Sequence, residues 1–172
     1  MNAATNNQAS HGVHANPARF TGRYPGKIDA KGRIVVPPEF RQRLTNNEIF
    51  VFPHFDEPLL QCGDDHLVSD LLSALGGLDE FDDDRAILEE EITGGVMRIV
   101  IDETGRTGLP KLLRDHAALE GSLGFAGRGQ HFVLGTAAYL DERRGAARAA
   151  AQKHRETLRA RMLPSVRSRR SS

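Results

Sequence analysis

Short apolar runs separated by turn residues follow one another along most of the chain, and they predict a β-rich protein with a few helices. Strands are expected, in chain order, at Lys27-Ile28, Ile34–Val36, Ile49–Phe52, Leu59–Cys62, Met97–Ile101, Thr107–Leu109, Ser122–Ala126 and His131–Gly135. Amphipathic helices are expected at Asp64–Leu75 and Asp79–Ile92, and a long helix rich in Ala and Arg at Ala137–Met162. The pattern indicates an α+β protein that is mainly β.

One stretch of the chain occurs twice. Asp29–Pro37 returns 73 residues later as Asp102–Pro110, and five of the sixteen positions in 29–44 are identical in 102–117. Each copy places Asp-x-x-Gly-Arg between two short strands, and a proline then begins a short helix, where its fixed φ and missing N–H suit the first turn. Two further strands complete each copy. The chain is therefore predicted to contain two βαββ repeats that arose by internal duplication.

The repeated turns carry the candidate binding chemistry. Asp at a turn start bonds backbone N–H groups further on, and Gly supplies a backbone angle that a side chain disfavours, so Asp29, Gly32, Asp102 and Gly105 are predicted to form the turns. An Arg directly after the glycine is held out on a rigid scaffold, where its planar fork can bond phosphates or guanine edges. The candidate nucleic-acid-binding residues are Lys27, Lys31, Arg33, Arg41 and Arg106.

A plainer interpretation is that Asp29 with Arg33, and Asp102 with Arg106, only stabilise their turns and bind no ligand. The duplication and the surrounding basic residues favour a polyanion. The second copy is less basic, with Glu103 and Thr104 in place of Ala30 and Lys31. If only one copy contacts a polyanion, the first is expected to do so.

Charge is distributed very unevenly, although the formal net charge is zero. Residues 1–44 hold seven basic and two acidic side chains, whereas residues 45–102 hold two basic and fifteen acidic ones. Residues 141–172 are again basic, with ten against three. A DNA-binding surface would have to face away from the acidic segment. The basic C-terminal stretch has two interpretations: it adds sequence-independent attraction to DNA, or it packs on the acidic segment of a neighbouring subunit.

Composition and motifs exclude several other classes of protein. Hydrophobic residues make up 39% and charged residues 27% of the 172 residues, as in soluble globular proteins. No run approaches the roughly 18 apolar residues of a membrane span, and the polar start does not resemble a signal peptide. The lone Cys62 excludes a disulfide framework and is expected to be buried. We predict no catalytic residues, no metal, no cofactor, no small-molecule substrate and no membrane partner, and a cytoplasmic location. An enzyme using Asp29 or Asp102 as acid or base ranks last, because no partner base is visible.

The two motifs, each followed by an apolar strand, a proline and a short helix, resemble the MraZ family, a bacterial branch of the AbrB/SpoVT-like swapped-hairpin superfamily. The resemblance covers about residues 19–142 and rests on Phe20–Tyr24, Asp29–Pro37, Asp102–Arg114, Leu119–Gly121 and Gly127–Gln130. The chain departs from the family pattern at Thr107-Gly108, which replaces a more apolar pair, so this strand is expected to be weak. The N-terminal extension and the Arg-rich tail lie outside the family core.

The resemblance implies a double-psi or swapped-hairpin β-barrel in which the two βαββ halves interlock, with peripheral helices and a C-terminal helix. It also implies a ring-shaped homo-oligomer, associated with the nucleoid, that binds short direct repeats in double-stranded promoter DNA. It further implies a transcriptional regulator, expected to repress its own operon of cell-division and cell-wall genes. Carried over by position, Arg33 with Lys31 beside it is the DNA-contacting arginine, and Arg106 is its counterpart. The alternative is an oligomeric scaffold with only non-specific affinity for nucleic acid.

Together these features divide the chain into five parts. They are a disordered tail (1–18), a first AbrB/SpoVT-like repeat (19–65), a helical connector (66–95), a second repeat (96–142) and a basic helical tail (143–172).

Overall fold

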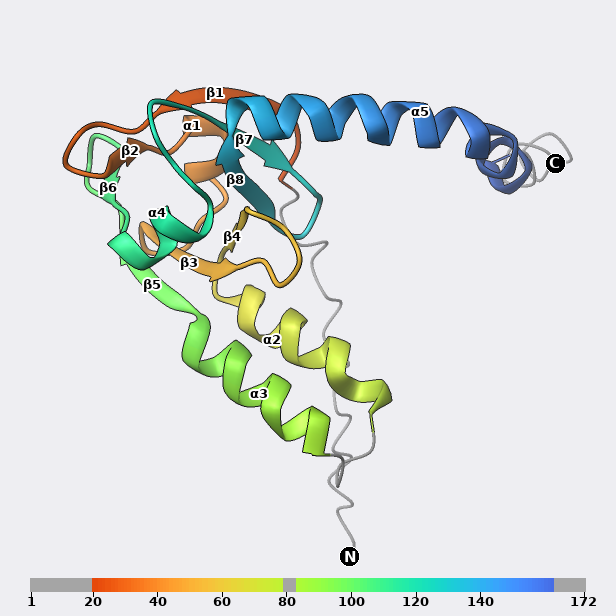
Figure 1. The fold of residues 1–172 in the computed structure, drawn as a ribbon, viewed down its shortest axis with the longest axis horizontal. Coiled ribbons are helices and arrows are strands. Elements are labelled where there is room, and N and C mark those ends of the chain that lie inside the picture. The colour runs from red at the N-terminus through yellow and green to blue at the C-terminus, as the bar shows by residue number, and fades with distance from the viewer. Residues whose placement is uncertain (1–19, 79–82, 163–172) are drawn as a thin grey trace, which may run out of the picture.

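The computed structural model describes residues 20–78 and 83–162 (Figure 1). The predicted N-terminal disordered tail and the Ser/Arg stretch after Pro164 lie outside these residues. The first half contains β1 (Arg23–Lys27), β2 (Arg33–Val35), α1 (Pro38–Arg41), β3 (Glu48–Pro53), β4 (Leu60–Gly63), α2 (His66–Ser73) and the 3-10 helix η1 (Ala74–Gly77). The second half contains α3 (Asp83–Gly95), β5 (Met97–Val100), β6 (Arg106–Gly108), α4 (Lys111–His116), β7 (Ser122–Gly127), β8 (Phe132–Thr136) and α5 (Ala137–Met162).

The strand order shows that the two repeats exchange strands. The main sheet runs β1-β7-β8-β4-β3-β5, and every pairing in it is antiparallel. The first strand of each repeat therefore pairs with the third strand of the other repeat, and β4 and β8 meet at the centre. Exchanging each strand for its counterpart in the other repeat gives the same order read from the opposite edge of the sheet. The predicted mainly β swapped-hairpin class is confirmed, each repeat having two strands before its short helix and two after it, and the six-stranded sheet keeps β1 and β5 as its edges.

The second strands of the two repeats form a separate ribbon. β2 pairs antiparallel with β6, so that Ile34 lies opposite Thr107 and Val35 lies opposite Arg106. The expectation of a weak strand at Thr107-Gly108 was wrong. Thr107 is buried and its hydroxyl donates a 2.7 Å hydrogen bond to the carbonyl of Val100, so its polar group is satisfied inside the fold.

The main core lies between the sheet, the ribbon and the two short helices. Phe40 of α1 is fully buried and contacts three aromatic rings, with centroid distances of 5.6 Å to Phe20, 5.0 Å to Tyr24 and 4.6 Å to Phe132. Leu113 of α4 occupies the corresponding place in the second repeat and is also fully buried. Each short helix therefore turns one apolar side chain into the core.

The first strand begins earlier than predicted. A short strand at Lys27-Ile28 was expected, whereas β1 runs from Arg23 to Lys27 and includes Pro25 and Gly26. Proline is tolerated because β1 is an edge strand. A Cβ at Gly26 would lie 2.5 Å from Leu123 Cδ1 of the neighbouring strand, so the glycine permits close packing there.

The acidic connector forms a helical hairpin. α2 and α3 pack on Phe52 of β3 through a small second core that includes Leu67, Leu75 and Ile92. The predicted helix Asp64–Leu75 is α2 continued by η1, and the predicted helix Asp79–Ile92 begins at Asp83 in the described part of the chain and ends at Gly95. Figure 1 shows this hairpin extending from the sheet, away from the β2–β6 ribbon.

The C-terminal helix α5 leaves the body of the molecule. It has the predicted bounds and spans about 39 Å at 1.5 Å per residue. Leu140 in its first turn is buried in a third cluster with Leu59, Ala126 and Val133. Residues 144–152 are all exposed, and Figure 1 shows the helix projecting far beyond β7 and β8. None of the described helices is both long and apolar enough to cross a membrane.

Candidate nucleic-acid interface

Each Asp-x-x-Gly-Arg segment forms the same tight turn. In the first, Asp29 Oδ1 accepts hydrogen bonds of 2.9 Å from the backbone N–H groups of Lys31 and Arg33. In the second, Asp102 Oδ1 accepts 2.9 Å bonds from the N–H groups of Thr104 and Arg106, and a 2.7 Å bond from the Thr104 hydroxyl. The glycines have φ of 78° and 85°, in the left-handed region. The aspartates thus accept the hydrogen bonds that close the turns, and the glycines supply the positive φ.

These hydrogen bonds hold both carboxylates in the charged form. The backbone N–H of Arg33 is the main cause that lowers the pKa of Asp29 below its usual value, and the Thr104 hydroxyl is the main cause for Asp102. A carboxyl group that serves as a general acid near neutral pH needs a raised pKa instead. Both shifts therefore argue against a general-acid role for Asp29 or Asp102.

Each turn is packed against an arginine from the other repeat. A Cβ at Gly32 would lie 2.8 Å from Arg114 Cζ, and a Cβ at Gly105 would lie 2.6 Å from Arg41 Cζ. Arg114 Nε donates a 3.1 Å hydrogen bond to the carbonyl of Leu109. Arg41 Nε is buried, and no hydrogen-bond acceptor contacts it among the described residues. The swap of strands thus places an arginine of each half behind the turn of the other half.

The exposed face of the β2–β6 ribbon gathers side chains from both turns. Ile34 and Thr107 point inward, whereas Arg33, Val35 and Arg106 are exposed on the opposite face. An open hollow of about 310 Å³, which we call the ribbon hollow, is lined by Lys27 at the end of β1, by Asp29 of the first turn, and by Arg33, Val35 and Arg106. Three cationic side chains, one from the second repeat and two from the first, therefore border one concave surface.

The two arginines of the ribbon hollow are engaged differently. Arg33 Nε lies 2.8 Å from Asp29 Oδ2. The first copy therefore contains the Asp–Arg pair that was expected if these residues only stabilise their turn. This pair occupies Nε and leaves the terminal nitrogens of the guanidinium without a hydrogen bond within the described chain. In the same set of residues, no hydrogen bond or ion pair engages the Arg106 guanidinium.

The structure brings together three of the five predicted binding residues, Lys27, Arg33 and Arg106. Lys31 lies exposed on the first turn, and Arg41 is half-buried behind the second turn. Sequence reasoning missed Val35, although alternation between buried Ile34 and Val36 could have marked it as outward-facing. The role of Arg114 was also missed, although the repeat alignment pairs it with Arg41.

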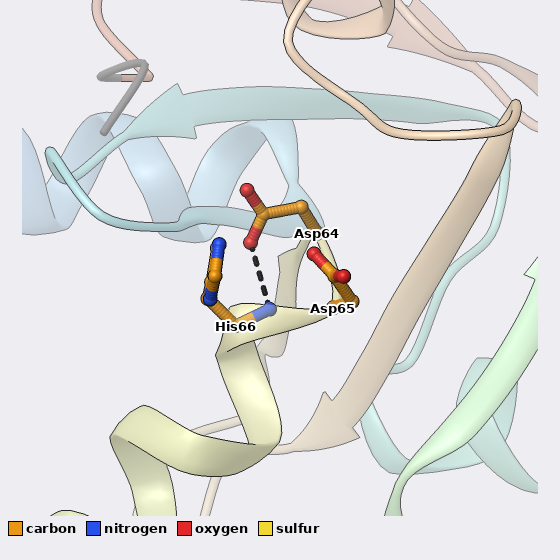
Figure 2. Close-up of side chains that lie close together, drawn as sticks. All are labelled: Asp64, Asp65 and His66. Atoms are coloured by element: carbon orange, nitrogen blue, oxygen red, sulfur yellow. Dashed lines mark hydrogen bonds between the residues drawn. The ribbon is translucent and has the colours of Figure 1, made fainter. Parts of the chain in front are cut away.

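Other reactive groups are accounted for by local structure. Cys62 is buried, as predicted, and burial raises the pKa of its thiol. Figure 2 shows Asp64, Asp65 and His66 at the start of α2. The atoms of these three side chains that could ligate a metal ion lie within 4.8 Å of one another. Asp64 Oδ1 accepts a 3.1 Å hydrogen bond from the backbone N–H of His66, so this carboxylate stabilises the turn that leads into α2.

A duplicated swapped-hairpin fold that presents arginines and a lysine around one hollow defines a β protein suited to binding a polyanion. Comparison with known proteins gives this class a family. The chain is 36% identical over 121 residues to the transcriptional regulator MraZ of Parvibaculum lavamentivorans, which covers 67% of the chain and 74% of that protein. It is 30% identical over 118 residues to MraZ of Methylocella silvestris, covering 67% and 72%. It is 29% identical over 143 residues to MraZ of Pelagibacter ubique, covering 81% and 92%.

The chain therefore belongs to the MraZ family of transcriptional regulators, and the predicted family is confirmed. No family model matches the chain. The relatives carry the name of a regulator and not of an enzyme, in agreement with the prediction.

Proposed function

We propose that the protein is a transcriptional regulator that binds DNA through the ribbon hollow. The observation that carries this proposal is the convergence of Lys27, Arg33 and Arg106 from the two repeats on one concave, exposed surface. Two of these residues belong to a duplicated motif whose turn geometry is the same in both copies.

The side chains of the ribbon hollow suit different parts of a DNA duplex. Arg33 is oriented by Asp29 through Nε, so its terminal nitrogens are available for a bidentate bond to guanine O6 and N7. Arg106 offers a second fork on the same face. Val35, which is 49% exposed between them, provides an apolar contact of the kind that a thymine methyl group takes. Lys27 and Lys31 supply point charges for phosphates, which fix position and add salt dependence.

The domain organisation follows from the same proposal. Residues 19–65 and 96–142 act as the two DNA-binding repeats, and the described part of the connector, residues 66–78 and 83–95, extends away from the ribbon (Figure 1). β5 separates the end of α3 from the second turn, so the acidic hairpin and the binding turn lie at opposite ends of this strand. Arg41 contributes by supporting the second turn from behind, and Arg114 does the same for the first.

Assembly into a ring on short direct repeats would explain how weak single contacts add up. Several ribbon hollows that meet successive repeats gain affinity through effective concentration, without any new contact. We propose that the regulated promoter is that of the protein's own operon of cell-division and cell-wall genes, where the bound ring represses transcription and is associated with the nucleoid.

The proposal is tested by removing one arginine at a time. Arg33→Ala should weaken binding to the promoter duplex by about 5- to 150-fold per contacted site, which corresponds to the 1–3 kcal/mol of a bidentate pair. Arg106→Ala should act in the same direction. Arg98→Ala removes the same charge from exposed β5, outside the ribbon hollow, and serves as the control.

Oligomer size is measured in parallel by light scattering. If Arg33→Ala dissociates the oligomer, the arginine has a structural role and the proposal fails. If neither ribbon variant differs from Arg98→Ala, the ribbon hollow does not read sequence, and an oligomeric scaffold with non-specific affinity is the better account.

A further inference from the structure

A second cationic hollow lies at the other end of β1. Arg23 at the start of β1, Arg128 between β7 and β8, and Arg143 in the second turn of α5 line a cavity of about 210 Å³. Its remaining lining is apolar or glycine, mainly Val133 and Leu140, and no acidic side chain of the described chain lines it. We call it the triple-arginine pocket.

Behind this pocket, one carboxylate holds two of the three arginines. Glu57 Oε1 accepts a 3.0 Å hydrogen bond from the Tyr139 hydroxyl and lies 2.9 Å from Arg143 Nε, in an ion pair that lacks hydrogen-bond geometry. Glu57 Oε2 is 3.9 Å from Arg128 Nη2, which is a long ion pair. Arg23 Nη1 donates a 3.3 Å bond to the carbonyl of Leu140. Three positive charges thus face the pocket against one negative charge behind it.

The excess positive charge is not fully compensated within the described protein. Burial is the main cause that lowers the pKa of Arg128, and the charges of Arg143 and Arg23 lower it further, against the opposing effect of Glu57. An anion in the pocket would remove this mutual repulsion. Guanidinium groups from β1, from the loop between β7 and β8, and from α5 offer forked donors, which match the several oxygens of a phosphate group better than a monatomic halide ion.

We propose that the triple-arginine pocket binds a phosphate group. Two sources share this chemistry: a backbone phosphate of bound DNA, and a free phosphorylated small molecule. Arg23 and Lys27 are both exposed on β1 and lie about 13 Å apart at 3.3 Å per residue. A duplex bound at the ribbon hollow could therefore reach the triple-arginine pocket along β1. Of the two sources, only the DNA phosphate rests on the proposed function.

Calorimetric titration of the full chain with inorganic phosphate, at ionic strength matched by chloride, tests the proposal. Saturable binding is expected for the unaltered protein and should be lost in Arg128→Gln and in Arg23→Gln. Arg128→Gln leaves Glu57 with Tyr139 and Arg143, so α5 keeps its anchor. Arg155→Gln is the control. It removes an equal charge from an exposed position on α5, about 18 Å from Arg143 along the helix, and should bind phosphate normally.

The absence of saturable binding, or equal binding by all three variants, would overturn the proposal. The source is distinguished with the promoter duplex. If DNA supplies the phosphate, prior binding of duplex blocks inorganic phosphate, and Arg128→Gln reduces the slope of log affinity against log salt by about 1. If a small molecule supplies the phosphate, prior binding of duplex leaves inorganic phosphate binding intact. Arg128→Gln then keeps the salt slope of the unaltered protein. Arg33→Ala should keep phosphate binding, so failure of the ribbon hollow and failure of this pocket are separable.

Discussion

The two turn glycines are constrained by backbone and by packing at once. Gly105 has φ of 85°, where a side chain is strained, and a Cβ there would collide with the Arg41 guanidinium. Gly32 stands in the same relation to Arg114. Because each arginine comes from the opposite repeat, a change at either glycine disturbs the contact between the two halves as well as the local turn.

Gly105→Ala should lower the free energy of unfolding by at least about 1 kcal/mol, since left-handed backbone alone costs an alanine about 1–2 kcal/mol. Urea denaturation measures the loss. Gly108→Ala is the matched control on the same ribbon, because its backbone φ is not positive and a Cβ there meets nothing within 4 Å. The control should change stability by less than about 0.5 kcal/mol. Equal effects of the two substitutions would contradict the role assigned to Arg41.

The aspartates make the turns sensitive to acid. The pKa values of Asp29 and Asp102 are lowered in the folded protein from their usual 3.8, so the native state holds fewer protons than the unfolded state. Their contribution to stability is present above that value and is lost as the pH falls through the lowered pKa values. Urea denaturation from pH 6 to pH 3 should therefore show a steeper loss of stability for the unaltered protein than for Asp102→Asn. Parallel curves would show that this carboxylate is not tied to folding.

At the residue scale, the sequence alone predicted the turn chemistry but not its partners. Asp29, Gly32 and their counterparts act within five residues, so local pattern is sufficient. The contact of Arg41 with Gly105 depends on which strands the two repeats exchange. The sequence pattern predicted Arg41 as a DNA contact because it does not show this exchange. In the structure Arg41 lies against Gly105 of the second turn.

At the scale of elements, pattern predicted most strands and the bounds of α5 but misjudged β1 and β6. β1 includes Pro25 and Gly26, which are acceptable only because it lies at a sheet edge. β6 contains Thr107, which looked too polar for a core strand. A single hydrogen bond to Val100 satisfies it. In both cases the deciding information is the neighbouring strand, which an isolated segment does not contain.

The exposed part of α5 should be dispensable for the fold. Residues 144–152 are exposed, and the buried anchor Leu140 and the Arg143–Glu57 contact lie before them. A protein that ends at Ala147 should keep its melting temperature within about 2 °C. Calorimetry checks this. A much larger drop would show that the helix packs on another part of the assembly, as expected if it contacts the acidic segment of a neighbouring subunit.

The same truncation separates the two interpretations of the basic tail. It removes eight basic residues and one acidic residue. If the tail attracts DNA, the truncated protein should lose affinity for any duplex and show a weaker salt dependence. If the tail serves assembly, oligomer size should change first, and light scattering would show it.

At the scale of the whole molecule, charge is sorted by element. Between residues 64 and 95 the chain holds eleven acidic residues and a single arginine, and the α2–α3 hairpin extends away from the ribbon (Figure 1). Basic side chains gather instead at the ribbon hollow and at the triple-arginine pocket. The expectation that the acidic segment would face away from the binding turns agrees with this arrangement, which lets a chain of zero net charge present a cationic surface.

The most direct test of the account is a titration of the protein against a duplex that carries its own promoter region, with a scrambled duplex of equal length, at two salt concentrations. We predict that the promoter duplex binds more tightly and keeps that advantage at the higher salt, because contacts to bases depend less on counterion release than contacts to phosphates. Equal binding of both duplexes that salt readily abolishes would contradict the account, and would leave the ribbon as a basic surface that does not read sequence.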